Sequence, residues 1–127
     1  MRDFPRVTEV FLSLARRLPF LVELAAGEPT QFPAARDFAY TTDAVRPIRI
    51  VFAPKLEMQT RARISGVLLH EFGHASLMRV GDAHHDEHAA DREALRLFGR
   101  RVRYDAATVQ TIDPRARYAL RPVRIGK

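Results

Sequence analysis

The residues of this sequence with the clearest chemical potential are two histidines four positions apart, His70 and His74. On an α-helix such residues lie on the same face one turn apart, so both imidazoles can reach a single metal ion. Glu71 follows the first histidine and is placed to take a proton from a water on that ion. This H-E-x-x-H spacing is typical of two zinc ligands and a general base, so it predicts a zinc site with Glu71 as the catalytic residue.

The surrounding sequence predicts that the motif lies in a helical hairpin spanning residues 64–98. Gly81 is expected to end the first helix and form a tight corner. Asp82 is then expected to cap a second helix that begins at once and ends before Gly99. Apolar residues at helical spacing predict that the first helix is amphipathic: Ile64, Val67, Leu68, Phe72, Ala75 and Met78.

The predicted hairpin selects candidates for the remaining ligand. A corner at Gly81 places Glu87 opposite His74, and Asp91 opposite His70. Because packed helices lie about 8–10 Å apart, inward side chains from both can meet at one ion. We therefore predict one zinc per chain, held by His70, His74 and Glu87 with water in the fourth position. Asp91 is predicted to accept the free ring N–H of a ligating histidine.

Other interpretations of these residues remain open. Imidazole is an equally acceptable zinc ligand, so His84, His85 or His88 could replace Glu87. Histidines at this spacing could also be ordinary polar surface without any metal. The group that stabilises a developing oxyanion is not identified, and the candidates are Arg101, Tyr104, Tyr118, His84, His85 and His88.

The run Glu87-His88-Ala89-Ala90-Asp91 matches the E-x-x-A-D signature that follows H-E-x-x-H in several gluzincin metallopeptidases. Residues 46–98 thereby resemble the small ImmA/IrrE-type proteins of that group. The resemblance implies a zincin-like fold, zinc ligation by His70, His74 and Glu87, and peptide hydrolysis with Glu71 as base. It also implies that the strand before the motif helix binds extended substrate by main-chain pairing. A metzincin is excluded, because Val80 stands where that class has its third histidine.

The remaining elements are predicted to support this helix. Asp3 is expected to cap an N-terminal helix with Pro5 in its first turn. Residues 20–24 form a second apolar run, and we expect both segments to pack behind the motif helix. Residues 48–52, between two prolines, predict a strand that is short or at an edge. Residues 28–45 are predicted to be a long loop whose aromatic residues anchor the core or line a groove: Phe32, Phe38 and Tyr40.

Length and composition predict one compact α+β domain over residues 1–127, mostly helical with a small sheet. The chain has no cysteine, which excludes thiolate metal sites. No apolar run reaches the length of a membrane span, and charged residues interrupt the N-terminal stretch, so a cytoplasmic location without membrane association is expected.

The net charge of +6 is concentrated at the C-terminal end. Residues 92–127 hold ten Arg or Lys and three acids, whereas residues 1–91 hold eleven and twelve. A basic segment, about residues 100–127, can bind nucleic acid or an acidic protein weakly and without base specificity.

The motif and the resemblance together predict a zinc metalloendopeptidase acting on a protein or peptide. The alternative is a non-catalytic regulatory or nucleic-acid-associated protein with a structural zinc.

Overall fold

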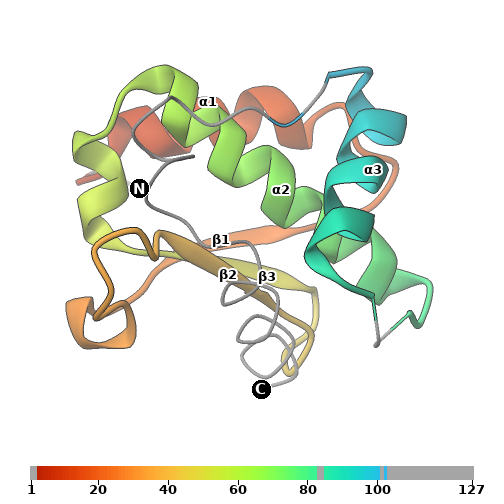
Figure 1. Cartoon of the computed structure of the whole chain (residues 1–127), viewed down its shortest axis with the longest axis horizontal. Helices are drawn as coiled ribbons and strands as arrows, with labels where there is room; N and C mark the ends of the chain where they lie inside the picture. The colour runs from red at the N-terminus through yellow and green to blue at the C-terminus, as the bar shows by residue number, and fades with distance from the viewer. Residues whose placement is uncertain (1–2, 83–84, 101, 103–127) are drawn as a thin grey trace.

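The computed structural model describes residues 3–82, 85–100 and 102, and these form three α-helices on one face of a small three-stranded sheet (Figure 1). Two short 3-10 helices, η1 and η2, join the main elements. In chain order the elements are α1 Pro5–Ala15, β1 Glu23–Ala26, η1 Pro29–Gln31, β2 Ala39–Thr42, β3 Arg49–Phe52, η2 Pro54–Met58, α2 Arg61–Arg79 and α3 Glu87–Phe98. The predicted α+β class is confirmed.

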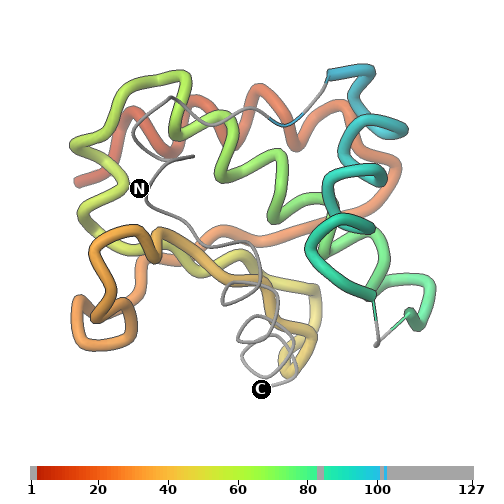
Figure 2. Tube along the Cα trace, in the orientation of Figure 1, coloured from red at the N-terminus to blue at the C-terminus, as the bar shows by residue number. Residues whose placement is uncertain are grey.

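The sheet has the strand order β1-β3-β2, with β1 parallel and β2 antiparallel to β3. Ile50 at the centre pairs with Leu24 on one side and with Thr41 on the other. Figure 2 shows that the chain turns back before β3, so that β3 lies beside β1, from which it is distant in the sequence. The strand predicted at residues 48–52 to be short or at an edge is therefore present and short, and it lies at the centre of the sheet. Pro47 and Pro54 lie outside the four paired residues, so their missing N–H groups do not interrupt the ladder.

Two strands lie where the sequence predicts none. The predicted loop over residues 28–45 is wrong for Ala39–Thr42, which form β2, and the apolar run at residues 20–24 overlaps β1. Each strand is only four residues long and takes its stability from pairing with β3, so its local pattern is weak. The expected core role is confirmed for Phe32 and Phe38, which are both buried.

The main core lies between the sheet and the helices, and Phe72 of α2 is at its centre. Its ring stacks on Phe11 of α1 at 5.3 Å between centroids and lies 5.7 Å from the ring of Phe98 in α3. Every residue from 66 to 76 is buried. The apolar residues predicted to share one face of this helix are all buried, as expected. Over this stretch the polar side of the helix is buried as well, because β2 and α3 cover it.

Helix α1 is capped from a distant part of the chain. The N–H groups of Arg6 and Val7 each donate to the carboxylate of Glu57 in η2 at 2.9 Å. This carboxylate satisfies amides that have no partner inside the helix, and it complements the helix dipole. The predicted cap at Asp3 is wrong, because Phe4 occupies the N-cap position and makes no side-chain cap bond.

The corner between α2 and α3 is longer than predicted. Gly81 adopts a positive φ of 85°, and its N–H donates to Met78 O while Asp82 N–H donates to Leu77 O. These two bonds form a Schellman motif that ends α2. The expected cap at Asp82 is wrong, since α3 starts only at Glu87, with Asp86 as the N-cap that accepts from the N–H of Ala89 at 2.8 Å.

Among the described residues, no helix combines the length and apolarity needed to cross a membrane.

Candidate metal centre

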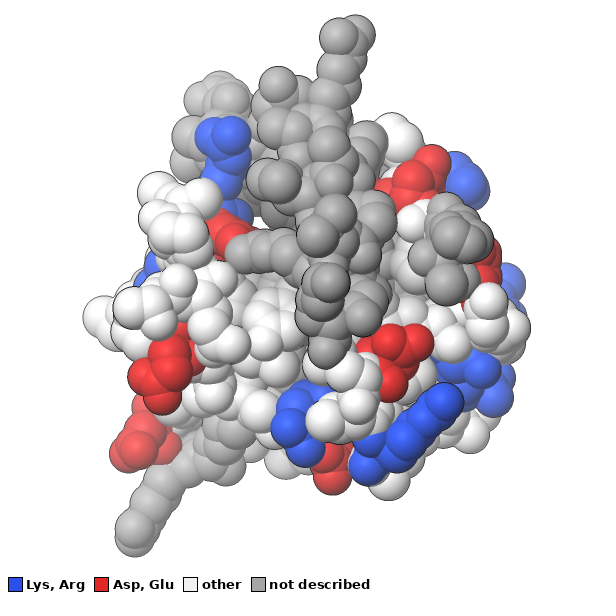
Figure 3. Space-filling model, turned by 90° about the horizontal axis from the view of Figure 1, so that it is seen from below, with Lys and Arg blue, Asp and Glu red and all other residues white. Residues whose placement is uncertain are grey.

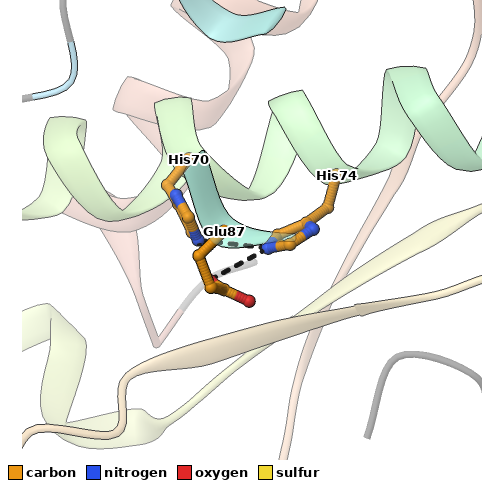
Figure 4. A group of neighbouring side chains, drawn as sticks. All are labelled: His70, His74 and Glu87. Atoms are coloured by element: carbon orange, nitrogen blue, oxygen red, sulfur yellow. Dashed lines mark hydrogen bonds and ion pairs between the residues drawn. The ribbon is translucent and has the colours of Figure 1, made fainter. Parts of the chain in front are cut away.

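Helix α2 presents the two motif histidines side by side. His70 and His74 project from the same face of the helix, one turn apart, toward Glu87 (Figure 4). Their rings are perpendicular, with centroids 4.6 Å apart, and the two Nε2 atoms are 3.1 Å from one another. The regular i,i+4 spacing of the helix is thus sufficient to aim both imidazoles at one point.

Helix α3 supplies the third group from its first residue. Glu87 Oε1 lies 3.2 Å from His74 Nε2 and also contacts His70 Nε2. Its place in the first turn of α3 favours the ionised carboxylate, because the N-terminus of a helix carries partial positive charge. His70, His74 and Glu87 therefore form a compact buried group that could hold a metal ion.

The chemistry of this group suits a first-row divalent metal ion. Ligands about 2.0–2.2 Å from such an ion at tetrahedral angles lie roughly 3.3 Å from one another, and two of the contacts are close to this, at 3.1 and 3.2 Å, whereas the contact between Glu87 Oε1 and His70 Nε2 is shorter. Two imidazoles and one carboxylate suit zinc and its first-row neighbours, whereas magnesium and calcium prefer oxygen ligands alone. Three protein ligands also leave a fourth tetrahedral position, as in catalytic zinc sites.

The hydrogen bonds behind the histidines indicate where their protons lie. His70 Nδ1 is 2.5 Å from the carboxylate Oδ1 of Asp91, an acceptor for a ring N–H. His85 Nδ1 is 2.6 Å from the carbonyl oxygen of Asp82, which can only accept, so Nδ1 carries the proton. The other ring nitrogen of a neutral His85 is then an acceptor, and His74 Nδ1 donates to it at 2.7 Å.

This arrangement directs three lone pairs at one another. With both Nδ1 atoms of the motif histidines protonated, His70 Nε2, His74 Nε2 and Glu87 Oε1 all face inward as acceptors. Buried acceptors in contact repel each other unless a cation lies between them. A metal ion, or in its place a proton on His70, satisfies all three.

The protonation states follow from the same contacts. Burial, reinforced by the neighbouring His70, lowers the pKa of His74 to about 4, although the contact with the Glu87 carboxylate favours the charged form. Burial also acts to lower the pKa of His70, but its contacts with Asp91 and Glu87 outweigh this and raise it. For Glu87, burial acts to raise the pKa, yet its contacts with both histidines hold it well below the usual range. At neutral pH the centre thus offers an ionised carboxylate and a neutral His74, the forms that bind metal.

Glu71 lies beside this centre and is held by the sheet. Thr41 of β2 places its hydroxyl 2.8 Å from Glu71 Oε1, and both residues are fully buried. The hydroxyl donates, because a carboxylate accepts only. A strand that the sequence does not predict therefore orients the candidate base.

Burial of the centre is nearly complete. His70 and His74 are each 1% exposed, and Glu71 and Glu87 are 0% exposed. Such burial strengthens every electrostatic contact within the group.

The other candidate residues either lie outside the group of His70, His74 and Glu87 or belong to the part of the chain that the structure does not describe. His85 lies behind His74, with its Nε2 at His74 Nδ1, and does not belong to the group of His70, His74 and Glu87. His88 is exposed on α3 and does not belong to the metal-binding group. The remaining candidates lie outside the described residues: His84, Arg101, Tyr104 and Tyr118.

Sequence reasoning missed two contributors to this site. Thr41 lies in a segment predicted to be loop, and nothing in its neighbourhood indicates a contact with Glu71, thirty residues away. His85 lies in a cluster of three histidines, each of which the sequence allows as a ligand, and the sequence offers no signal that separates a ligand from the residue that supports one.

Comparison with family models, with curated proteins and with solved structures finds no match to this chain.

Proposed function

We propose that this protein is a zinc-dependent metallopeptidase that hydrolyses peptide bonds with Glu71 as general base. The observation that carries the proposal is the convergence of three buried acceptors, His70 Nε2, His74 Nε2 and Glu87 Oε1, beside a carboxylate fixed by Thr41. A zinc ion there would lower the pKa of a coordinated water to about 7 and polarise the scissile carbonyl. Glu71 would act as the general base, accepting a proton from the attacking water and delivering it to the leaving amine.

For the substrate, we propose a peptide in extended conformation bound along β2. The resemblance assigned this role to the strand at residues 48–52, but β3 is hydrogen-bonded to β1 on one side and to β2 on the other. Its main chain therefore has no side left for a substrate. Among the described residues β2 forms an edge of the sheet, and Thr41 joins this strand to Glu71. Pairing along β2 would lay a peptide next to the base.

The test is hydrolysis by the zinc-loaded protein. Purified protein with one equivalent of zinc is incubated with an unfolded protein and with a mixture of synthetic peptides, and products are identified by mass spectrometry. Cleavage should require zinc, stop on chelation, and fall at least ~10²-fold in Glu71→Gln, which cannot accept the proton. Cleavage that persists unchanged in zinc-loaded Glu71→Gln contradicts the assigned mechanism.

A second candidate is a non-catalytic protein with a structural zinc, either regulatory or associated with nucleic acid. The near-complete burial of all four groups favours it, because a structural site needs no path for substrate. The two candidates differ in the number of protein ligands, since structural sites are closed by four. X-ray absorption of the zinc-loaded protein distinguishes three protein ligands plus water from four.

The partner proposed for the basic end of the chain is nucleic acid or an acidic protein. On the face shown in Figure 3, acidic and basic side chains of the described residues are interspersed. The feature that supports electrostatic association is the excess of ten basic over three acidic residues in the sequence of 92–127.

A further inference from the structure

The corner between α2 and α3 contains a buried histidine whose two ring nitrogens are both engaged. His85 is 8% exposed and lies between the carbonyl oxygen of Asp82, 2.6 Å from its Nδ1, and His74 Nδ1, 2.7 Å from its Nε2. Its ring is tilted by 42° to that of His74, with centroids 4.9 Å apart. This imidazole joins a backbone carbonyl to a candidate zinc ligand.

The position of that carbonyl is fixed by the end of α2. The Schellman bonds from Gly81 N–H to Met78 O and from Asp82 N–H to Leu77 O hold the first two residues of the corner against the last helical turn. The carbonyl of Asp82 is therefore anchored to the same helix that carries His74. The corner of the hairpin and the motif histidine form one continuous hydrogen-bonded unit.

The direction of donation decides which nitrogen of His74 is available. Because the Asp82 carbonyl requires a proton on His85 Nδ1, His85 Nε2 accepts and His74 Nδ1 must donate. Only His74 Nε2 then retains a lone pair, and this atom faces His70 Nε2 and Glu87 Oε1. Without His85, His74 would be free to place its proton on Nε2, which cannot bind metal.

We propose that His85 is a positioning residue for the metal centre: it holds His74 in the Nδ1–H tautomer and so presents Nε2 to zinc. His70 Nδ1 contacts the carboxylate of Asp91. His74 Nδ1 instead contacts the imidazole of His85, which lies in the corner between α2 and α3. The inference rests on the metal site of the proposed function, but it does not depend on peptide hydrolysis. Outer partners of this kind contribute about 10–100-fold in metal affinity.

The test compares zinc affinities, measured by competition with a chromogenic chelator. His85→Phe keeps an aromatic ring but has no acceptor, and it should bind zinc about 10–100-fold more weakly than the wild type. His85→Gln retains an oxygen acceptor and should recover much of that loss. Leu12→Phe, at an exposed position on α1, is the control and should leave the affinity unchanged. Equal affinity in His85→Phe and wild type overturns the proposal.

Long-range ¹H–¹⁵N spectra of the wild-type histidines test the same point without any substitution. His85 should carry its proton on Nδ1 and remain unligated when zinc is added, while His74 shows a metal-bound Nε2. A zinc-induced shift on a His85 nitrogen would make it a ligand and overturn the proposal. Zinc binding with these features but without hydrolysis refutes only the peptidase function, and a wild type that takes up no zinc refutes both.

Discussion

Gly73 of α2 faces the backbone of Ala90 in α3 so closely that a Cβ atom built on Gly73 lies 2.0 Å from the Ala90 carbonyl oxygen. Gly73 immediately precedes His74 in the motif, and Ala90 is three residues beyond Glu87. The backbones of the two helices are therefore in close contact beside the candidate metal centre. A side chain of any size at this position would push Glu87 away from the histidines.

This contact predicts an inverted effect for Gly73→Ala. In an ordinary helix the substitution stabilises by about 1 kcal/mol, because alanine restricts the unfolded chain and favours the helix. Here the added methyl group meets backbone that cannot rotate away, so we expect destabilisation by about 1–3 kcal/mol and weaker zinc binding. Thermal unfolding and zinc titration measure both effects. A stabilised variant with unchanged zinc affinity would show that the helices do not approach this closely.

The wild-type protein should contain about one zinc per chain, and chelation should lower its thermal midpoint, because the metal stabilises the folded state.

Substitutions of the three acidic residues around the centre should weaken zinc binding to different degrees. Glu87→Ala removes a ligand and should lose most of the metal. Asp91→Ala should cost ~10–100-fold in affinity, because it leaves His70 without its supporting acceptor. Glu71→Gln should retain zinc.

Elemental analysis and competition titration give the order of these three variants. Full zinc retention in Glu87→Ala would show that the third ligand is another residue. A wild-type protein that contains no transition metal and takes up none on titration would end the zinc assignment altogether.

The Thr41 hydroxyl should support Glu71 through its hydrogen bond. Thr41→Val keeps the shape of the side chain but removes the donor to a buried carboxylate, and a buried bond to a charged group contributes about 1–3 kcal/mol. We expect destabilisation of that size and slower hydrolysis at unchanged zinc content, with recovery in Thr41→Ser. Equal stability and activity in Thr41→Val and wild type would remove Thr41 from the site.

The metal-free protein should be most stable near pH 6.5. His74 has its pKa lowered from 6.5 to about 4 in the fold, so its contribution is present above pH 6.5 and is lost as the pH falls toward 4. His70 has a raised pKa, so its contribution is present below pH 6.5 and is lost as the pH rises. Between pH 6.5 and pH 4.5 the loss from His74 should reach roughly 2 kcal/mol.

Denaturant unfolding of the metal-free protein across this range measures the profile. In His74→Gln the loss of stability below pH 6.5 should be smaller, whereas Leu12→Gln, at an exposed position on α1, should not change the profile. If the free energy of unfolding of His74→Gln falls just as steeply below pH 6.5 as that of the wild type, other groups cause the loss.

The basic end of the chain should give salt-dependent association with DNA, RNA or an acidic protein. Removal of residues 114–127 deletes four Arg and the final Lys, so the affinity and its dependence on salt should both fall. Fluorescence anisotropy at low salt with labelled nucleic acids and an acidic peptide measures this. Wild-type protein that binds none of these probes at low salt contradicts the idea.

The sequence by itself determined the helix with His70 and His74, and the facing position of Glu87 across a helical corner. These depend on i,i+4 spacing and on Gly81 as a helix terminator, which are local properties of the chain. It also indicated β3, whose β-branched and aromatic residues form a clear pattern between prolines.

Tertiary structure alone decided the remaining parts. The strands β1 and β2 become favourable only when β3 pairs with them, so their short segments show no signal of their own. Glu57 replaces the local cap of α1 because a carboxylate from a distant 3-10 helix reaches the same amides. Thr41 and His85 gain their roles from hydrogen bonds across 30 and 11 positions of sequence, whose geometry exists only after the helices have packed on the sheet. Periodicity reports which face of an element is apolar, but not which buried polar side chain will meet another.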